Sequence, residues 1–537
     1  MNPPTSQPLP VGRGPRAFLA AYEQLVRPLR QRHGETYWRF ALQADSQLQS
    51  QLEELEGHLS GLHADPQAFA ALERWVASDQ EPLVQRQLEI LLPEFRRAQV
   101  DQALRLRIIK LGLEVEEAFT TSRPTVDGQV LNSNQLDREL LVATDRGRRR
   151  RIWEATREVG RDVQSTVVEL AELRNEVART LGFSDYFTLE LHDQEMHPDE
   201  LFGVLDAMRA KTDGPWALRK ARLDEEIAQL RGVPAAELMP WDYTDRFLQS
   251  VPRQQPGKGT DAWFTLAAIK RNTQGFYRGI GLPVDALWRR GDLLPRDGKS
   301  PHAFCIGIDN PTDVRVLCNL DSTARWMETS LHEFGHAVYN ARIAPELPWL
   351  LRDASHTFIT EAVAMFFGRM VKTAPWLRDV AGVPHSVARR AEEDLTESQL
   401  VFARWGLLVT YFEREMYRDP SQDLQALWWS LAGDIQGLSR PQGWDGPDWA
   451  SKVHVACYPA YYQNYLLGEL LASQFRAVLI ERTGQGEVEP GFAGRPEVGA
   501  FFDELFVAGQ RLRWDATVNS HTGHALTADH WVRQFAG

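Results

Sequence analysis

The chain has 537 residues, a net charge of −13 with neutral histidines, 43% hydrophobic residues and 25% charged residues. This is the composition of a globular protein with a large core, which excludes fibrous and intrinsically disordered proteins. The negative net charge disfavours a general nucleic-acid or anionic-membrane binder, because the summed field repels phosphate. Three cysteines are too few for a disulfide scaffold and favour a cytoplasmic location.

The first residues, MNPPTSQPLPVGRGPRA, have proline and glycine where a secretory signal would have its apolar core. We therefore expect residues 1–15 to be a disordered lead-in. We find no run of about eighteen apolar residues, so we expect no membrane-spanning helix.

Apolar residues at spacings of three and four predict helices over most of residues 17–112, with a polar break at Ala64-Asp65-Pro66. A second stretch, 145–182, predicts one long or slightly broken amphipathic helix. The dipeptide His197-Pro198 suits a helix start. Residues 252–260 (PRQQPGKGT) indicate a loop.

The spacing of apolar residues changes from helical to strand-like at residues 303–320. Two runs rich in β-forming residues, AFCIGI and VRVLCNL, flank DNPTD there and predict a hairpin. Helical pattern resumes near Thr323 and continues almost to the end. These patterns predict a mainly α protein with one small β element in its middle. Cys305 and Cys318 lie on opposite arms of the hairpin, and we expect free thiols in a reducing cytoplasm, whereas in an exported protein they could form a bridge.

The segment His332-Glu333-Phe334-Gly335-His336 has two histidines four residues apart, which share one face of a helix. Both imidazoles can then reach one metal ion, while the glutamate beside the first contacts its bound water. The helix is predicted independently by an apolar stripe on another face: Met327, Leu331, Phe334 and Val338. The motif therefore predicts a catalytic zinc site.

A third ligand is needed, and Tyr339 and Arg342 stand where a metzincin would have glycine and histidine. Glu361 opens the apolar segment EAVAMFFGRMV, where an ionised carboxylate is costly unless a cation pairs with it. We therefore predict zinc held by His332, His336 and Glu361, with the fourth position open to water. Three rival ligands lie in the intervening loop: Glu346, Asp353 and His356.

The motif with Glu361 twenty-five residues beyond His336 resembles the gluzincin peptidases of the thimet oligopeptidase, oligoendopeptidase F and angiotensin-converting enzyme group. The run from Glu328 to His336 (ETSLHEFGH) is especially similar to the thimet oligopeptidase form. Glu328 lies one turn before His332 and is a candidate acceptor that fixes an imidazole tautomer. The resemblance implies one catalytic unit over 16–537, with two helical lobes, a deep central channel and a metal-site core at about 300–475. We expect a monomer or homodimer.

Residues 300–320 look like the β-ribbon that precedes the metal helix in this group. In relatives this edge strand pairs with the substrate backbone. The resemblance therefore implies that Phe304, Cys305 and Gly307 contact the peptide substrate.

The segment from His454 to Tyr465 (HVACYPAYYQNY) is similar to the family's histidine followed by closely spaced tyrosines. The resemblance implies that Tyr465 stabilises the transition-state oxyanion and that His454 and Tyr462 contact the substrate backbone. The match shifts by one residue between relatives, which keeps Tyr461 and Tyr458 as alternatives.

Two further positions bear on the branch of the family. Met365 stands where the converting-enzyme and thermolysin patterns have aspartate, which favours the oligopeptidase branch. Lys452 precedes His454 by two residues, as does a lysine that holds a substrate C-terminal carboxylate in converting enzymes.

We therefore expect zinc-dependent hydrolysis of short unstructured peptides, with Glu333 as general base and no nucleic-acid or membrane partner. One alternative is a carboxypeptidase or carboxydipeptidase that trims peptide C-termini. The other is a non-catalytic helical peptide-binding protein with a structural zinc, although a structural site has no use for a base such as Glu333.

Overall fold

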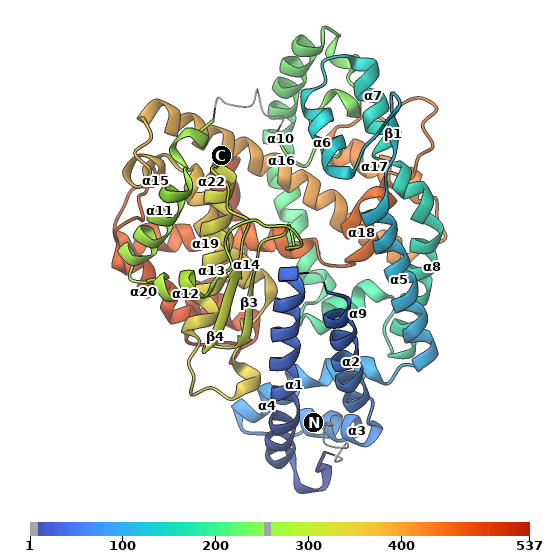
Figure 1. Cartoon of the computed structure of the whole chain (residues 1–537), viewed down its shortest axis with the longest axis vertical. Helices are drawn as coiled ribbons and strands as arrows, with labels where there is room; N and C mark the ends of the chain where they lie inside the picture. The colour runs from blue at the N-terminus through green and yellow to red at the C-terminus, as the bar shows by residue number, and fades with distance from the viewer. Residues whose placement is uncertain (1–8, 44, 252–258) are drawn as a thin grey trace. The chain divides into compact units, whose positions relative to one another are not determined.

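The computed structural model describes residues 9–43, 45–251 and 259–537 (Figure 1). Residues 1–8 of the predicted lead-in and residues 252–258 of the predicted loop lie outside the described residues. Within the predicted lead-in, Leu9 packs in a hydrophobic core and Val11–Arg13 form a 3₁₀ turn, so these described residues are folded.

The described chain divides into two compact units, each assembled from three segments. Unit 1 comprises residues 1–100, 259–391 and 471–526, and unit 2 comprises residues 101–258, 392–470 and 527–537. Two helices contribute to both units: α16 (His385–Arg418) and α19 (Gln463–Thr483).

Unit 1 contains the hairpin and most of the predicted N-terminal helices. Its other elements are α1 (Pro15–Gln43), α2 (Ser46–His63), α3 (Pro66–Val76), α4 (Pro82–Ala98), α11 (Leu266–Gly279), α12 (Asp285–Arg290), β3 (Phe304–Asp309), β4 (Asp313–Leu317), α13 (Ala324–Arg342), α14 (Thr357–Arg369), α15 (Ala374–Asp379), α20 (Pro496–Phe506) and α21 (Trp514–Thr522).

Unit 2 is also mainly helical. Its other elements are α5 (Gln102–Thr121), β1 (Thr125–Val126), β2 (Gln129–Val130), α6 (Ser133–Val142), α7 (Arg146–Ala155), α8 (Glu158–Thr180), α9 (Tyr186–Asp193), α10 (Pro198–Arg231), α17 (Leu424–Leu431), α18 (Val453–Cys457) and α22 (Asp529–Phe535).

Side-chain caps explain several of the helix boundaries that the sequence indicates. The Asp65 carboxylate accepts from the backbone N–H groups of Gln67 and Ala68 at the start of α3, where Pro66 occupies the first position. His197 caps α10 in the same way. The segment 145–182 forms two helices, α7 and α8, so the prediction of a slightly broken helix is confirmed.

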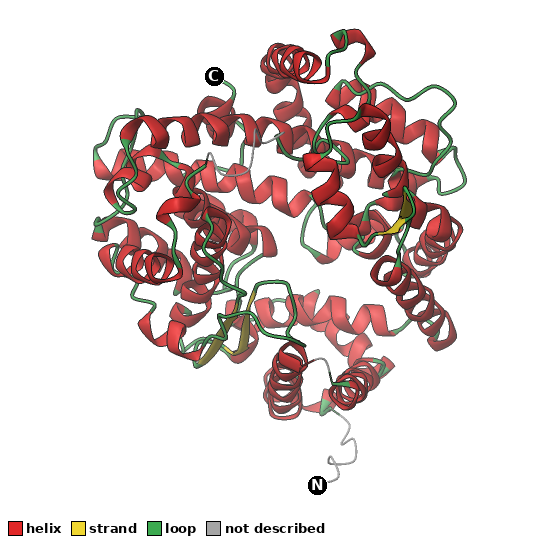
Figure 2. Cartoon of the chain, turned by 45° about the horizontal axis from the view of Figure 1, so that its top comes forward, coloured by secondary structure: helices red, strands yellow, loops and turns green. Residues whose placement is uncertain are grey.

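The predicted hairpin is confirmed, with β3 and β4 antiparallel and Cys305 opposite Val316. The prediction of a single β element is wrong, because β1 and β2 form a second two-stranded ribbon (Figure 2). Its turn, Asp127-Gly128, has φ of +51° and +80° at the two positions. An Asp-Gly pair is the turn that a two-residue hairpin prefers, so the sequence held a local signal that we did not use.

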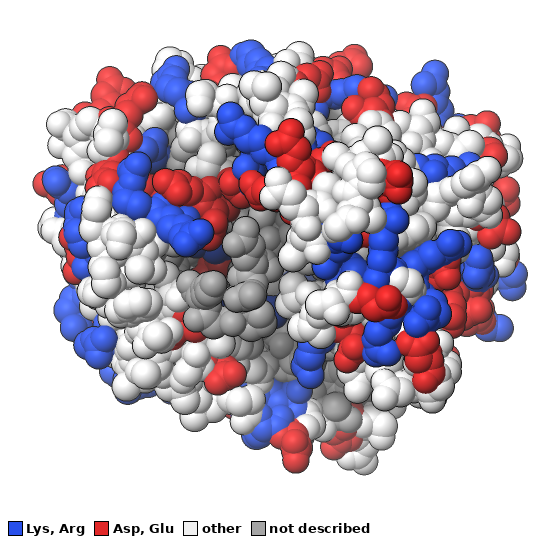
Figure 3. All heavy atoms as spheres, turned by 90° about the horizontal axis from the view of Figure 1, so that it is seen from above, with Lys and Arg blue, Asp and Glu red and all other residues white. Residues whose placement is uncertain are grey.

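The mainly α fold with a small β-ribbon beside the metal helix is confirmed, because β3 and β4 both pack against α13. None of the described helices has the length and apolarity needed to cross a membrane. Basic and acidic side chains are interspersed on the face drawn in Figure 3.

Candidate metal centre

The metal helix is α13, and Thr323 starts it by accepting a hydrogen bond from the backbone N–H of Trp326. The predicted apolar stripe is buried throughout: Met327, Leu331, Phe334 and Val338. Burial of this stripe fixes the rotation of α13 and turns His332 and His336 toward α14.

Two glycines allow α13 and α14 to pack closely. A Cβ atom on Gly335 would lie 2.9 Å from the Cα atom of Ala364, and one on Gly368 would lie 3.3 Å from the Cβ atom of His332. Larger residues at these points would push the helices apart. The glycine inside the metal motif therefore helps to bring Glu361, on α14, to the two histidines.

His332, His336 and Glu361 form a group whose potential ligand atoms all lie within 4.8 Å of one another. The Glu361 Oε2 atom lies 3.7 Å from His332 Nε2 and 4.0 Å from His336 Nε2. Ligand atoms about 2.0–2.2 Å from a tetrahedral zinc lie about 3.4 Å apart. The group is slightly wider than this, so small side-chain rotations would fit it to zinc.

The surroundings of both imidazoles favour the neutral form, which is the form that binds a metal ion. Burial lowers the pKa of His332 to about 4, although the charge of Glu328 opposes the shift. Burial also lowers the pKa of His336, whose Nδ1 lies 2.8 Å from the Thr360 hydroxyl. The His336 tautomer that donates from Nδ1 to Thr360 leaves Nε2 free to bind a metal.

Thr360 is not among the predicted site residues, although it directly precedes Glu361 in the chain. Glu328, the predicted tautomer-fixing residue, accepts a hydrogen bond from Lys372 at 2.7 Å, and its charge acts on His332. Its role in orienting His332 stays a prediction.

Glu333 is only 7% exposed. Burial and the Glu361 carboxylate raise the pKa of Glu333 to about 8, while a hydrogen bond with the Cys305 backbone opposes the rise. A buried carboxyl group next to the ligand cluster is placed to exchange a proton. The hairpin thus contacts the predicted base through β3.

The rival ligands lie outside the group of three among the described residues. His356 instead caps α14, because its Nδ1 accepts from the backbone N–H of Phe358 at 3.1 Å. This explains the histidine without a metal and leaves Glu361 as the acidic member of the group.

On β3, Phe304 packs its ring against Tyr37 and Trp38 of α1. Cys305 is half-buried and Gly307 is exposed. The expected thiols are present, since Cys305, Cys318 and Cys457 are all free cysteines. Substrate contacts by β3 stay a prediction.

The second predicted cluster forms within unit 2. The ring of His454 lies 5.2 Å from that of Tyr462 and 6.3 Å from that of Tyr465, measured between centroids. Tyr461 packs edge-on against Tyr465 at 5.3 Å, whereas Tyr458 is 52% exposed. Burial lowers the pKa of His454 to about 4. The structure therefore gathers His454, Tyr461, Tyr462 and Tyr465, and the half-exposed Tyr458 ring also packs 6.1 Å from the His454 ring.

Lys452 adds a buried ammonium group to this cluster. Its Nζ donates to Gln249 Oε1 at 2.9 Å and lies 5.0 Å from the Trp405 ring and 5.6 Å from the Tyr462 ring. Burial lowers the pKa of Lys452 to about 8. This side chain is only 8% exposed.

The fold, the metal motif and the glutamate on the next helix define a gluzincin zinc metallopeptidase. Residues 253–535, more than half of the chain, match the family described as angiotensin-converting enzyme, and the protein belongs to this family. A mitochondrial intermediate peptidase from Neurospora crassa is 27% identical over 148 residues, which cover 26% of this chain and 18% of the relative. The chain thus spans less than a fifth of the length of that curated relative.

Proposed function

We propose that the protein is a zinc-dependent oligopeptidase that hydrolyses peptide bonds in short unstructured peptides. The observation that carries the proposal is the buried Glu333 beside the convergent group of His332, His336 and Glu361. A structural zinc site has four protein ligands and no use for a base, whereas three ligands with an adjacent carboxyl group suit hydrolysis.

In this mechanism His332, His336 and Glu361 would hold the metal. When bound, zinc supplies Lewis acidity that polarises the scissile carbonyl and acidifies water. Glu333 removes a proton from the attacking water and returns it to the leaving amine. Thr360 keeps the His336 ring oriented by accepting its Nδ1–H.

The remaining groups would bind and orient the peptide. The family resemblance supports the Tyr465 hydroxyl as a neutral donor to the developing oxyanion, with Tyr462 and His454 on the substrate backbone. An extended peptide could add to the outer edge of β3 near Phe304, Cys305 and Gly307. This pairing needs an extended backbone, which favours unstructured peptides over folded proteins.

A specific observation favours a second candidate, a carboxydipeptidase. The Lys452 ammonium is caged by aromatic rings, and Gln249 Oε1 is its hydrogen-bond acceptor among the described residues. Such a buried cation suits a substrate C-terminal carboxylate. Met365, in contrast, favours the oligopeptidase branch.

One experiment tests both candidates. The purified protein would be incubated with a peptide library in free-acid and C-terminally amidated forms, with and without a chelator, and the cuts mapped by mass spectrometry. We expect chelator-sensitive internal cuts in both forms. Cuts restricted to free C-termini would favour the carboxydipeptidase. An absence of cuts, with zinc retained, would favour the non-catalytic peptide-binding protein.

A further inference from the structure

The turn between α18 and α19 carries the tyrosines of the predicted substrate site. At its centre Ala460 has a φ of +52° and is 1% exposed. Residues with a Cβ atom seldom adopt this left-handed conformation, and it persists only where surrounding contacts hold it. Tyr461, Tyr462 and Tyr465 follow directly, so the conformation of Ala460 sets where this segment starts.

Side chains hold both polar backbone groups of Ala460, and those of Glu413 and Gln463 are fully buried. The Glu413 carboxyl group, on α16, accepts from the Ala460 N–H at 2.9 Å. The Ala460 carbonyl accepts from the amide groups of Gln463 and Gln194. Asn464 in turn donates to Gln194 Oε1 at 3.1 Å. Residues from three parts of unit 2 thus fix one strained peptide.

Helix α16 also holds a tyrosine of the site itself. The indole N–H of Trp405 donates to the Tyr462 hydroxyl, and both side chains are buried. Trp405 precedes Glu413 by eight residues on α16, a little over two helical turns. One helix therefore anchors the turn and the hydroxyl of Tyr462.

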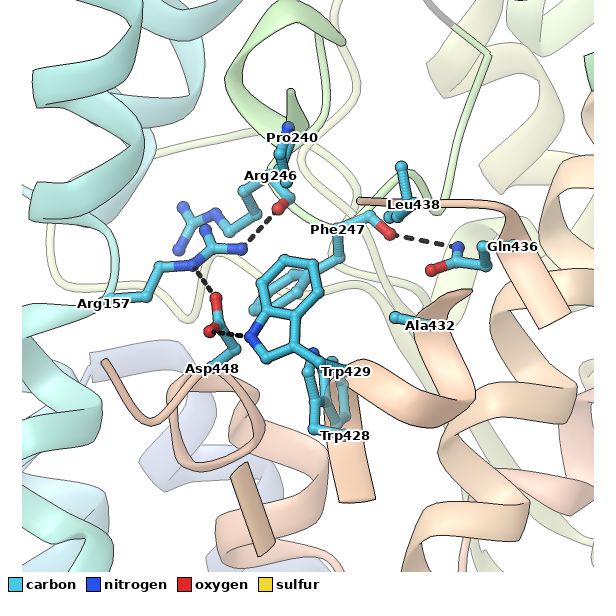
Figure 4. Close-up of a pocket in the computed structure, with 10 residues that line it drawn as sticks. All are labelled: Arg157, Pro240, Arg246, Phe247, Trp428, Trp429, Ala432, Gln436, Leu438 and Asp448. Carbon is cyan, nitrogen blue, oxygen red and sulfur yellow. Dashed lines mark hydrogen bonds and ion pairs between the residues drawn. The ribbon is translucent and has the colours of Figure 1, made fainter. Parts of the chain in front are cut away.

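Asp448, another buried carboxylate of unit 2, shows what a structural role requires. It is 1% exposed and accepts from Arg157 at 2.9 Å (Figure 4). Its second oxygen accepts from Gln425, Trp429 and Trp444. An arginine and three further donors thus offset the cost of burying this charge.

Glu413 lacks such compensation. It is fully buried, and within the described part of the chain its Oε2 atom has no hydrogen-bond partner. Arg174 acts on it electrostatically, but that guanidinium donates to the Tyr417 hydroxyl. Burying a carboxyl group with so few hydrogen-bond partners costs stability, so its presence here needs a functional reason.

We propose that Glu413 is a positioning residue: it clamps Ala460 in the left-handed turn and thereby orients Tyr461, Tyr462 and Tyr465 for the peptide substrate. This inference rests on the proposed function. Burial raises the pKa of Glu413 to about 8, so a neutral carboxyl group still accepts the Ala460 N–H at physiological pH.

The test compares four variants by kinetics, zinc content and hydrogen exchange of residues 458–465. Glu413→Ala should lower kcat about tenfold to a hundredfold with little change in KM, and should speed exchange while zinc content is unchanged. Glu413→Gln keeps an acceptor for Ala460 and should stay within a few fold of wild type. Ala460→Gly adopts positive φ without strain, so adding it to Glu413→Ala should recover part of kcat. The matched control is Glu415→Ala, on the same helix.

Unchanged exchange at 458–465 in Glu413→Ala, or faster exchange with unchanged kcat, would overturn the positioning role. A wild-type protein that cleaves no peptide would overturn the proposed function, while hydrogen exchange would still test the clamp. If Glu413→Ala fails to fold, Ala460→Val tests the same turn, because a β-branched residue disfavours positive φ. An unchanged kcat in Ala460→Val would equally contradict the proposal.

Discussion

The metal group of unit 1 and the tyrosine group of unit 2 are built in opposite ways. The metal group holds two half-buried imidazoles and the half-buried Glu361 carboxylate beside the buried Glu333, and Glu361 raises the pKa of Glu333 there. The tyrosine group consists of neutral rings beside one ammonium group, that of Lys452, and protein hydrogen bonds hold them in place, as Trp405 does for Tyr462. The first arrangement needs a cation to balance its charge, whereas the second is complete within the chain. Loss of a metal ligand should therefore lower the zinc content, whereas loss of a tyrosine hydroxyl should lower kcat and leave the zinc content unchanged.

The largest expected effect follows from removing the carboxylate ligand. Glu361→Ala leaves two imidazoles to hold the ion, so zinc content should fall well below one per chain and metal-dependent turnover should disappear. Elemental analysis after dialysis measures this directly. The matched variants His356→Ala and Asp353→Ala should retain zinc. An unchanged zinc content in Glu361→Ala would point to a different third ligand.

Glu333→Gln should separate catalysis from metal binding. Loss of the general base should lower kcat by about 10²–10⁴-fold while zinc content stays at the wild-type level. Steady-state kinetics and elemental analysis on the same sample provide both readouts, with Glu346→Gln as a surface control. Appreciable turnover by the Glu333→Gln variant would remove this residue from its role.

Tyr465→Phe should have a smaller effect and leave the metal group intact. Loss of one oxyanion donor typically lowers kcat by about 10²–10³-fold. Because the phenyl ring keeps the packing against Tyr461 and Tyr462, KM and zinc content should change little. Tyr458→Phe, at an exposed position, serves as the control. If Tyr458→Phe gave the larger loss, the roles of the tyrosines would have to be reassigned.

The last expected effect is on the pH dependence of stability rather than on activity. Burial raises the pKa of Glu413 from its ordinary value of 4.5 to about 8, while the Ala460 N–H and, less strongly, Arg174 oppose the rise. The folded protein then binds one more proton than the unfolded chain between these values, so stability falls as pH rises through that window. The slope is about 1.4 kcal/mol per pH unit.

Urea unfolding at pH 5, 6, 7 and 8 would measure this contribution. Glu413→Gln should flatten the slope, and Glu415→Gln should leave it unchanged. Besides Arg174, the titratable groups coupled to Glu413 are Tyr417 and Tyr462, and burial raises the pKa of Tyr417 to about 12. They stay protonated over this range, so a persistent slope in Glu413→Gln would assign the effect to another group.

The sequence alone determined the features that depend on short-range periodicity. The four-residue spacing of His332 and His336, the apolar stripe of α13 and the capping of α3 and α10 all act within about two turns of helix. Glu361 could also be predicted, because an isolated carboxylate in an apolar helix demands a partner. The Asp127-Gly128 hairpin carried an equally local signal.

Tertiary structure decided the rest, because these contacts join residues far apart in the chain. Trp405 and Tyr462, or Glu413 and Ala460, meet only once α16 has packed beside the turn before α19. Likewise Gly335 matters only because Ala364 comes to lie against it. Residue types and their spacing can predict a metal site. Which buried polar group lacks hydrogen-bond partners depends on the side chains that tertiary packing places next to it.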